Sequence, residues 1–129
     1  MFRHLDIEME RPFDPVAAMV AYHDALERRD FKYIGITLAE NAVYQSKGLG
    51  PVEGRDAILA AMQGYFAKHP NHKSWDTSTK LEGRLVASCT WELRATDNDT
   101  GNAISRHGHE RVTFDAKGRI IRVDVEDLI

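Results

Sequence analysis

The second half of the chain alternates apolar and polar residues in four runs, and this pattern restricts the possible folds more than any other feature of the sequence. The runs cover about residues 73–81, 84–96, 103–115 and 119–127, with turn residues between them. Alternation with a period of two is typical of strands with one buried face, and short turns join strands that run antiparallel. The sequence therefore predicts a four-strand antiparallel meander in this half.

The first half of the chain has the residue spacing of helices. Asp14 followed by Pro15 predicts an N-cap and the first turn of a helix that ends near Arg29. Asp30 predicts the cap of a short second helix that ends near Leu38. The first helix would have one apolar face, formed by residues three and four apart: Met19, Tyr22 and Leu26. We expect this face to lie against the sheet.

A third helix is predicted after a short strand and a loop. Residues 42–46 are typical of a strand, whereas residues 47–53 contain two glycines and a proline and predict a loop. The third helix begins at Gly54 and ends before Pro70, because proline cannot continue a helix. Helices first and strands afterwards indicate an α+β fold class.

Length and composition indicate one globular domain. The 129 residues are 43% hydrophobic, which fits a loose N-terminal lead-in over residues 1–13 and a single domain over residues 14–129. The net charge of -3 and the lack of a basic run argue against nucleic acid as a partner. No stretch approaches the ~20 apolar residues of a membrane span, so we expect a cytoplasmic protein without a membrane partner. The single cysteine, Cys89, indicates a small core residue rather than a nucleophile.

Glu110 interrupts the apolar face of the third run. Ile104, Val112 and Phe114 point to the same face of a regular strand, so the pattern places a carboxyl group among them. A buried carboxyl group is a candidate acid, base or neutral hydrogen-bond donor inside a pocket. The alternative is that this end of the strand is exposed to solvent, so that the Glu110 side chain is in water.

The inward positions of the strands also suggest a hollow. Large aromatic residues share these positions with Ala87 and Gly108, which suggests a curved sheet that leaves room beneath it. With an unbroken period of two, the runs point Trp75, Thr77 and Ile121 inward as well.

Several short motifs resemble those of a known superfamily. Asp30-Phe31 follows the first helix, and the sequences LAENAVYQS, EGRDAI and FDAKGRI follow in that order. Together they resemble the nuclear transport factor 2-like superfamily, particularly its SnoaL-like polyketide cyclases and its ketosteroid isomerase-like members. The resemblance implies a cone-shaped fold, with three N-terminal helices packed on a curved antiparallel sheet and an open end that admits a small apolar molecule.

The resemblance also implies roles for individual residues. Tyr22 and Glu110 match the two oxyanion-hole residues of the ketosteroid isomerases, although Tyr22 could equally be a core tyrosine. The position of the isomerases' aspartate base is Ser46, which cannot remove a proton from carbon at neutral pH, and this argues against ketosteroid isomerase activity proper. Asp127, on the inward phase of the last run, could supply the missing base. We expect no cofactor.

His107 and His109 fall on the face opposite to Glu110 if the third strand is regular. Members of this superfamily commonly use that face for dimer packing, so the resemblance implies a homodimer through the outer sheet face. A closed metal site would need carboxylate or thiolate ligands in addition to two histidines. Neither this pair nor His69 with His72 has such ligands nearby in sequence, so we expect no metal. A bulge at Gly108 would instead turn one histidine inward.

The sequence thus predicts an enclosed pocket for a small apolar or aromatic molecule. The chemistry would be isomerisation, cyclisation or dehydration by proton transfer, with Tyr22, Glu110 and Asp127 as catalytic residues, or with an inward His109 as the base. The alternative is a non-catalytic binding module or a dimeric assembly module. Twelve further residues would form the pocket wall: Met19, Leu26, Tyr44, Ser46, Met62, Phe66, Trp75, Cys89, Trp91, Gly108, Val123 and Val125.

Overall fold

The computed structural model describes residues 12–47 and 49–128. The predicted lead-in over residues 1–13 therefore lies outside the described residues, except for its last two. Three helices are present in the described part of the chain: α2 (Pro15–Arg28), α3 (Phe31–Thr37) and α4 (Arg55–Lys68). Six strands accompany them: β1 (Leu38–Ser46), β2 (Gly50–Glu53), β3 (Lys73–Gly83), β4 (Val86–Thr96), β5 (Ala103–Phe114) and β6 (Ile120–Asp127).

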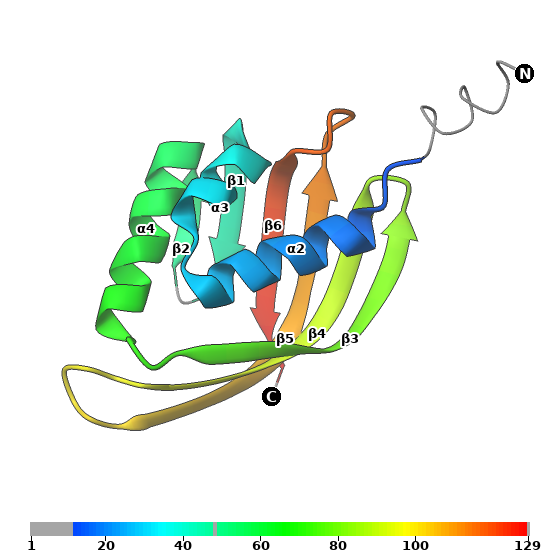
Figure 1. Ribbon diagram of the computed structural model, residues 1–129. Coiled ribbons are helices and arrows are strands. Elements are labelled where there is room, and N and C mark those ends of the chain that lie inside the picture. The colour runs from blue at the N-terminus through cyan, green and yellow to red at the C-terminus, as the bar shows by residue number, and fades with distance from the viewer. Residues whose placement is uncertain (1–11, 48, 129) are drawn as a thin grey trace, which may run out of the picture.

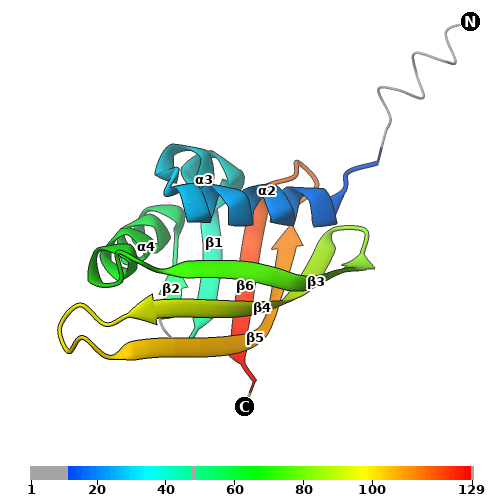
Figure 2. The ribbon, with the colours of Figure 1, turned by 60° about the horizontal axis from the view of Figure 1, so that its bottom comes forward.

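The six strands form one sheet, and the helices cover one of its faces. The strand order is β2-β1-β6-β5-β4-β3, and every neighbouring pair is antiparallel except β1 and β6, which are parallel. The sheet is mixed, because of this one parallel pair, rather than antiparallel throughout. Figure 1 shows α2 lying across the sheet, and Figure 2 shows β3, β4 and β5 curving round below it. The predicted α+β class with three helices is confirmed.

Helix α2 begins where the sequence predicted. The Asp14 side chain accepts a hydrogen bond from the backbone N–H of Ala17 at 3.1 Å, which satisfies one of the free amides of the first turn. The helix ends at Arg29, whose backbone takes the left-handed conformation that terminates helices. The buried side of α2 packs on the sheet through Met19, Tyr22 and Ala25, none of which is exposed.

Strands β4 and β5 keep the predicted alternation along their whole length. Their register is regular from Val86 opposite Thr113 to Thr96 opposite Ala103, so no bulge occurs at Gly108. Gly108 lies opposite Trp91, and the Trp91 indole lies where a side chain on Gly108 would be. Because this position carries no side chain, the indole can occupy the space next to β5.

Bulges make the sequence prediction wrong in two other strands. In β3 the register shifts between Asp76 and Ser78, so Asp76 lies opposite Trp91 on the inner face, and Trp75 lies opposite Glu92 on the outer face. The inward orientation predicted for Trp75 and Thr77 is therefore wrong.

In β6 the register shifts in the same way beside Thr113. Phe114 lies opposite Ile120, which is fully buried, whereas Ile121 is only partly buried. Ile120 therefore takes the inward place that the alternation predicted for Ile121. A bulge adds one residue to one strand, and the residues before it then point to the face opposite to the predicted one. The loop predicted over residues 47–53 also contains the short strand β2, which pairs with the end of β1.

We predict that Gly108→Ala destabilises the protein by about 1–3 kcal/mol, because the added methyl group would lie 2.5 Å from Cζ2 of Trp91 and against the Glu126 carbonyl oxygen. Gly64→Ala is the matched control, since Gly64 lies within α4 with nothing within 4 Å of an added Cβ. We expect the control to stabilise the protein by about 0.5–1 kcal/mol. Urea unfolding of both variants measures the difference. Equal stability of the two would mean that Trp91 does not lie against β5.

Candidate functional site

A cavity of about 440 Å³ lies between α2, α4 and the inner face of the curved sheet. Its size falls within the usual range of small-molecule pockets. The wall includes three exposed residues, Val20 and Asp24 of α2 and Trp75 of β3, and these mark its open side. Apolar side chains form much of the deeper wall: Leu26, Leu49, Met62, Phe66, Leu93 and Val125.

Three ionisable side chains meet at one part of this wall. The His23 ring lies between two carboxylates, with Nδ1 2.8 Å from Oδ2 of Asp76 and Nε2 3.1 Å from Oε1 of Glu110. Each residue comes from a different element, respectively α2, β3 and β5. Glu110 is 8% exposed and borders the cavity, so the predicted inward carboxyl group is present and does not reach open solvent.

The two carboxylates keep His23 charged. Burial lowers the pKa of His23, but the charge of Glu110 and the hydrogen bonds from His23 to Asp76 and Glu110 outweigh burial and raise the pKa to about 10. His23 is therefore an imidazolium at neutral pH, and both its nitrogens donate protons. The positive charge in turn stabilises negative charge on Glu110. The three groups together carry a net charge of about -1, from two carboxylates and one imidazolium.

Two tyrosines lie close to this cluster. Tyr44 borders the cavity, and burial together with the charge of Glu110 raises the pKa of its phenol, so the hydroxyl keeps its proton and can donate it. Tyr22 is fully buried and does not border the cavity, and its hydroxyl has no hydrogen-bond partner among the described residues. Burial also raises the pKa of the Tyr22 phenol. Of these two tyrosines, Tyr44 is the one that a bound molecule can reach.

Asp127 is engaged in an ion pair. Arg106 donates two hydrogen bonds to it, from Nε at 2.9 Å and from Nη2 at 2.7 Å. These bonds hold the pKa of the Asp127 carboxyl below its usual value. The pairing argues against Asp127 as a base, because a carboxylate that binds a guanidinium at two points gives up its charge reluctantly. Arg106 itself borders the cavity.

The twelve predicted wall residues divide into three groups. Trp75 borders the cavity only at its open side and is 43% exposed. Seven residues line the cavity as expected: Leu26, Tyr44, Ser46, Met62, Phe66, Trp91 and Val125. Four others lie in the core or the sheet without bordering the cavity: Met19, Cys89, Gly108 and Val123.

His107 and His109 lie opposite Glu92 and Thr90, on the outer face of β5 that the sequence predicted for them. A different group could hold a metal ion, since His23, Cys89 and Glu110 bring one ligand atom each within 4.8 Å of one another. Both His23 nitrogens already face carboxylates, and burial raises the pKa of the Cys89 thiol, so a metal would have to displace protons from both. The contacts therefore fit proton chemistry better than metal binding.

Sequence reasoning missed His23 and Asp76. His23 is four residues after Met19 and three before Leu26, which places it on the margin of the apolar stripe, and this spacing was the available signal. Asp76 gave no such signal, because only the bulge before Ser78 turns it inward.

Residues 19–123 match the family model of the SnoaL-like domain, which is most of the chain. The protein belongs to the SnoaL-like domain family. Its fold is that of the nuclear transport factor 2-like superfamily. No curated protein matches the sequence. Among the described residues, no helix of this SnoaL-like protein is both long and apolar enough to cross a bilayer.

Solved structures share the fold at low sequence identity. A candidate polyketide cyclase from Xanthomonas campestris pv. campestris has a TM-score of 0.75 at 17% identity, over 85% of this chain and 87% of that chain. A candidate isomerase of the SnoaL-like family from Agrobacterium tumefaciens has a TM-score of 0.70 at 22% identity, over 89% and 97%. A Mycobacterium tuberculosis protein in complex with estradiol-17β-hemisuccinate has a TM-score of 0.75 at 13% identity, over 86% and 91%.

We predict that His23 keeps both ring protons at pH 8, because its pKa lies near 10. Nitrogen-15 NMR of the imidazole ring, assigned by comparison with His23→Gln, measures this directly. Glu110→Gln removes the largest cause that raises the pKa of His23, so in this variant the ring should lose a proton at a lower pH. A neutral imidazole at pH 8 in the unaltered protein would contradict the charged cluster.

The same pKa predicts how stability depends on pH. The folded pKa of His23 lies above its unfolded value, so its contribution is complete below pH ~6.5 and is lost as the pH rises toward about 10. We expect the free energy of unfolding to fall by up to about 1.4 kcal/mol per pH unit above pH ~6.5. The double variant Asp76→Asn with Glu110→Gln should lack this slope. Urea unfolding between pH 6.5 and 8.5 tests both proteins, and parallel curves would exclude the linkage.

Proposed function

We propose that this protein binds a small apolar or aromatic carbonyl compound in the cavity and moves a proton on it without a cofactor. The observation that carries the proposal is a buried carboxylate, Glu110, that borders an apolar cavity and is backed by the imidazolium of His23. The names of the cyclase and isomerase neighbours support chemistry of this class, and the steroid ester bound to a third neighbour supports an apolar ligand.

In this proposal Glu110 is the general base. One of its oxygens faces Nε2 of His23, and the other is available to a C–H group next to the carbonyl of the bound compound. As the carboxylate takes the proton, the electron pair of the C–H bond moves onto the carbonyl oxygen. The Tyr44 hydroxyl, which stays protonated, can donate to that oxygen. Return of the proton from Glu110 to a different carbon completes an isomerisation. In a cyclisation the enolate carbon attacks a second carbonyl of the same molecule, and the alkoxide that forms takes the proton back from Glu110.

His23 and Asp76 act as positioning residues in this scheme. Asp76 orients the His23 ring through Nδ1, and the ring then orients Glu110 through Nε2. An apolar wall excludes water and so strengthens the interaction between each charge and the reacting atoms. The base thus comes from β5, and not from the last residue of β6 as the sequence suggested.

The base role can be tested before the natural substrate is known. A nitrobenzisoxazole loses a proton to a carboxylate as its N–O bond breaks, and the coloured nitrophenolate that forms is measured by absorbance. We predict that Glu110→Gln lowers this rate by on the order of a hundredfold or more. Asp127→Asn is the control that distinguishes Glu110 from Asp127 as the base. It should leave the rate close to that of the unaltered protein, because Asp127 is paired with Arg106.

Binding of the probe is measured separately, by quenching of the fluorescence of Trp91, in a protein that carries Trp75→Phe. Equal rates with and without Glu110, while the probe still binds, would remove the base role. That result would favour a non-catalytic binding module, in which the cluster only shapes the cavity.

We also propose that the protein is a homodimer through the outer face of β3, β4 and β5. Trp75 supports this, since its ring is well exposed beside outward-facing Glu92 and an exposed tryptophan is typical of an interface. Sedimentation velocity of the protein and of Trp75→Ser tests it.

A further inference from the structure

A second histidine, His72, also borders the cavity, and the proposed reaction gives it no role. His72 is 8% exposed, and its Nδ1 has no hydrogen-bond partner among the described residues. The nearest acid is Glu27, whose Oε1 is 3.9 Å from Nδ1, which is beyond hydrogen-bond reach. That oxygen already accepts from the backbone N–H of Ser74 at 3.0 Å and from its hydroxyl at 2.9 Å. Nδ1 is therefore enclosed by the protein. Nε2 has no hydrogen-bond partner among the described residues either, but it is not enclosed, so it is the nitrogen through which His72 can meet a molecule in the cavity.

His72 is neutral, unlike His23. Burial lowers the pKa of His72 to about 4, and the positive charges of Arg29, His69 and Arg106 act in the same direction. A neutral imidazole has one N–H donor and one nitrogen acceptor. The weak attraction of the Glu27 carboxylate favours the proton on Nδ1, which leaves the lone pair on Nε2.

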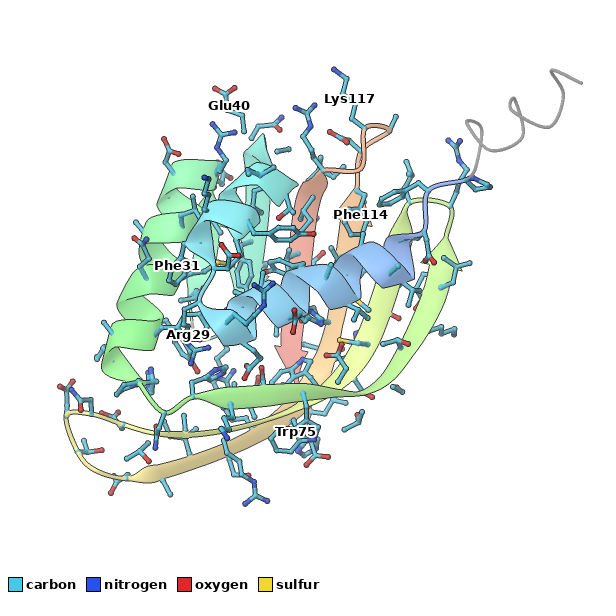
Figure 3. All side chains as sticks on the ribbon, in the orientation of Figure 1. Arg29, Phe31, Glu40, Trp75, Phe114 and Lys117 are labelled. Atoms are coloured by element: carbon cyan, nitrogen blue, oxygen red, sulfur yellow. The ribbon has the colours of Figure 1, made fainter. Side chains whose placement is uncertain are left out.

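The surroundings of His72 hold its ring in place. The rings of Tyr65 and Phe66 meet it edge to face, with centroids 5.3 and 5.2 Å away. Arg29 stacks on Phe66 at 3.8 Å and donates a hydrogen bond to the His72 carbonyl oxygen at 2.9 Å. Figure 3 shows Arg29 where the end of α2 faces α4. The ring is thus fixed before any ligand arrives, as expected of a recognition group.

His72 and the Glu110 cluster lie apart along the cavity. His72 precedes Asp76 by four residues, on the order of 13 Å along an extended chain. Glu27, beside His72, follows His23 by one helical turn, about 6 Å along the axis of α2. A molecule of two or three fused rings spans such a distance.

We propose that Nε2 of His72 accepts a hydrogen bond from a hydroxyl group of the bound molecule, at the end opposite the carbon that Glu110 deprotonates. This rests on the proposed function and narrows the substrate class to a neutral fused-ring ketone with a hydroxyl on its far ring.

Two matched probes test this subsite. Acetonaphthone carries a carbonyl on one ring, and its hydroxylated form carries a hydroxyl on the other ring as well. A naphthol, like the phenol of tyrosine, keeps its proton at neutral pH and can donate. We expect the protein to bind the hydroxylated probe about tenfold more tightly, as measured by Trp91 fluorescence in the Trp75→Phe background. His72→Phe keeps the ring packing and should abolish this preference.

Two further variants make the outcome decisive. His72→Gln restores an acceptor near the position of Nε2 and should recover most of the preference. Glu110→Gln should still bind the hydroxylated probe more tightly, although it loses turnover of the nitrobenzisoxazole. A wrong subsite and a wrong base would therefore give different results. Equal binding of the two probes, or a preference that survives His72→Phe, would overturn the subsite. Binding of neither probe would overturn both the subsite and the proposed pocket function.

Discussion

A carboxylate can be held in an apolar interior only if a cation compensates its charge, and in this protein His23 supplies that cation. Nε2 of His23 lies 3.1 Å from Glu110, and Asp76 holds the other side of the ring at 2.8 Å. Removing one partner of such a group leaves an unpaired buried charge, which is far more costly than replacing the whole group by apolar residues. The cluster therefore connects α2, β3 and β5 to one another at the wall of the cavity.

Two local irregularities of the fold make this meeting possible. The bulge after Asp76 turns that residue inward while the rest of β3 keeps its pairing with β4. Gly108, two residues before Glu110, leaves room for the Trp91 indole next to β5, where the ring borders the cavity. The bulge and the glycine both interrupt the regular sheet next to the cavity. Bulges and glycines are common beside functional sites for this reason.

The sequence was sufficient for the helices, for the class of fold and for the inward side of β4 and β5, because each depends on local periodicity. Glu110 could be placed for the same reason, since its strand is regular. Asp76 could not be placed, because a bulge leaves no mark in a pattern of period two. The partners of each acid could not be placed either, since the contact of Asp127 with Arg106 and of Glu110 with His23 depends on three-dimensional distance. The β1–β6 pairing, in which Val43 lies opposite Arg122, 79 positions later in the chain, cannot be predicted from local spacing either.

The charge of the cluster bears on which molecules the cavity can accept. Two carboxylates and one imidazolium leave the cluster with a net charge of about -1, so an anionic ligand is repelled and a neutral carbon acid is not. In the proposed reaction Glu110 becomes neutral as the substrate oxygen gains its negative charge, so the total charge does not change. The new anion then faces a cluster that has lost its excess negative charge, with Tyr44 able to donate to it.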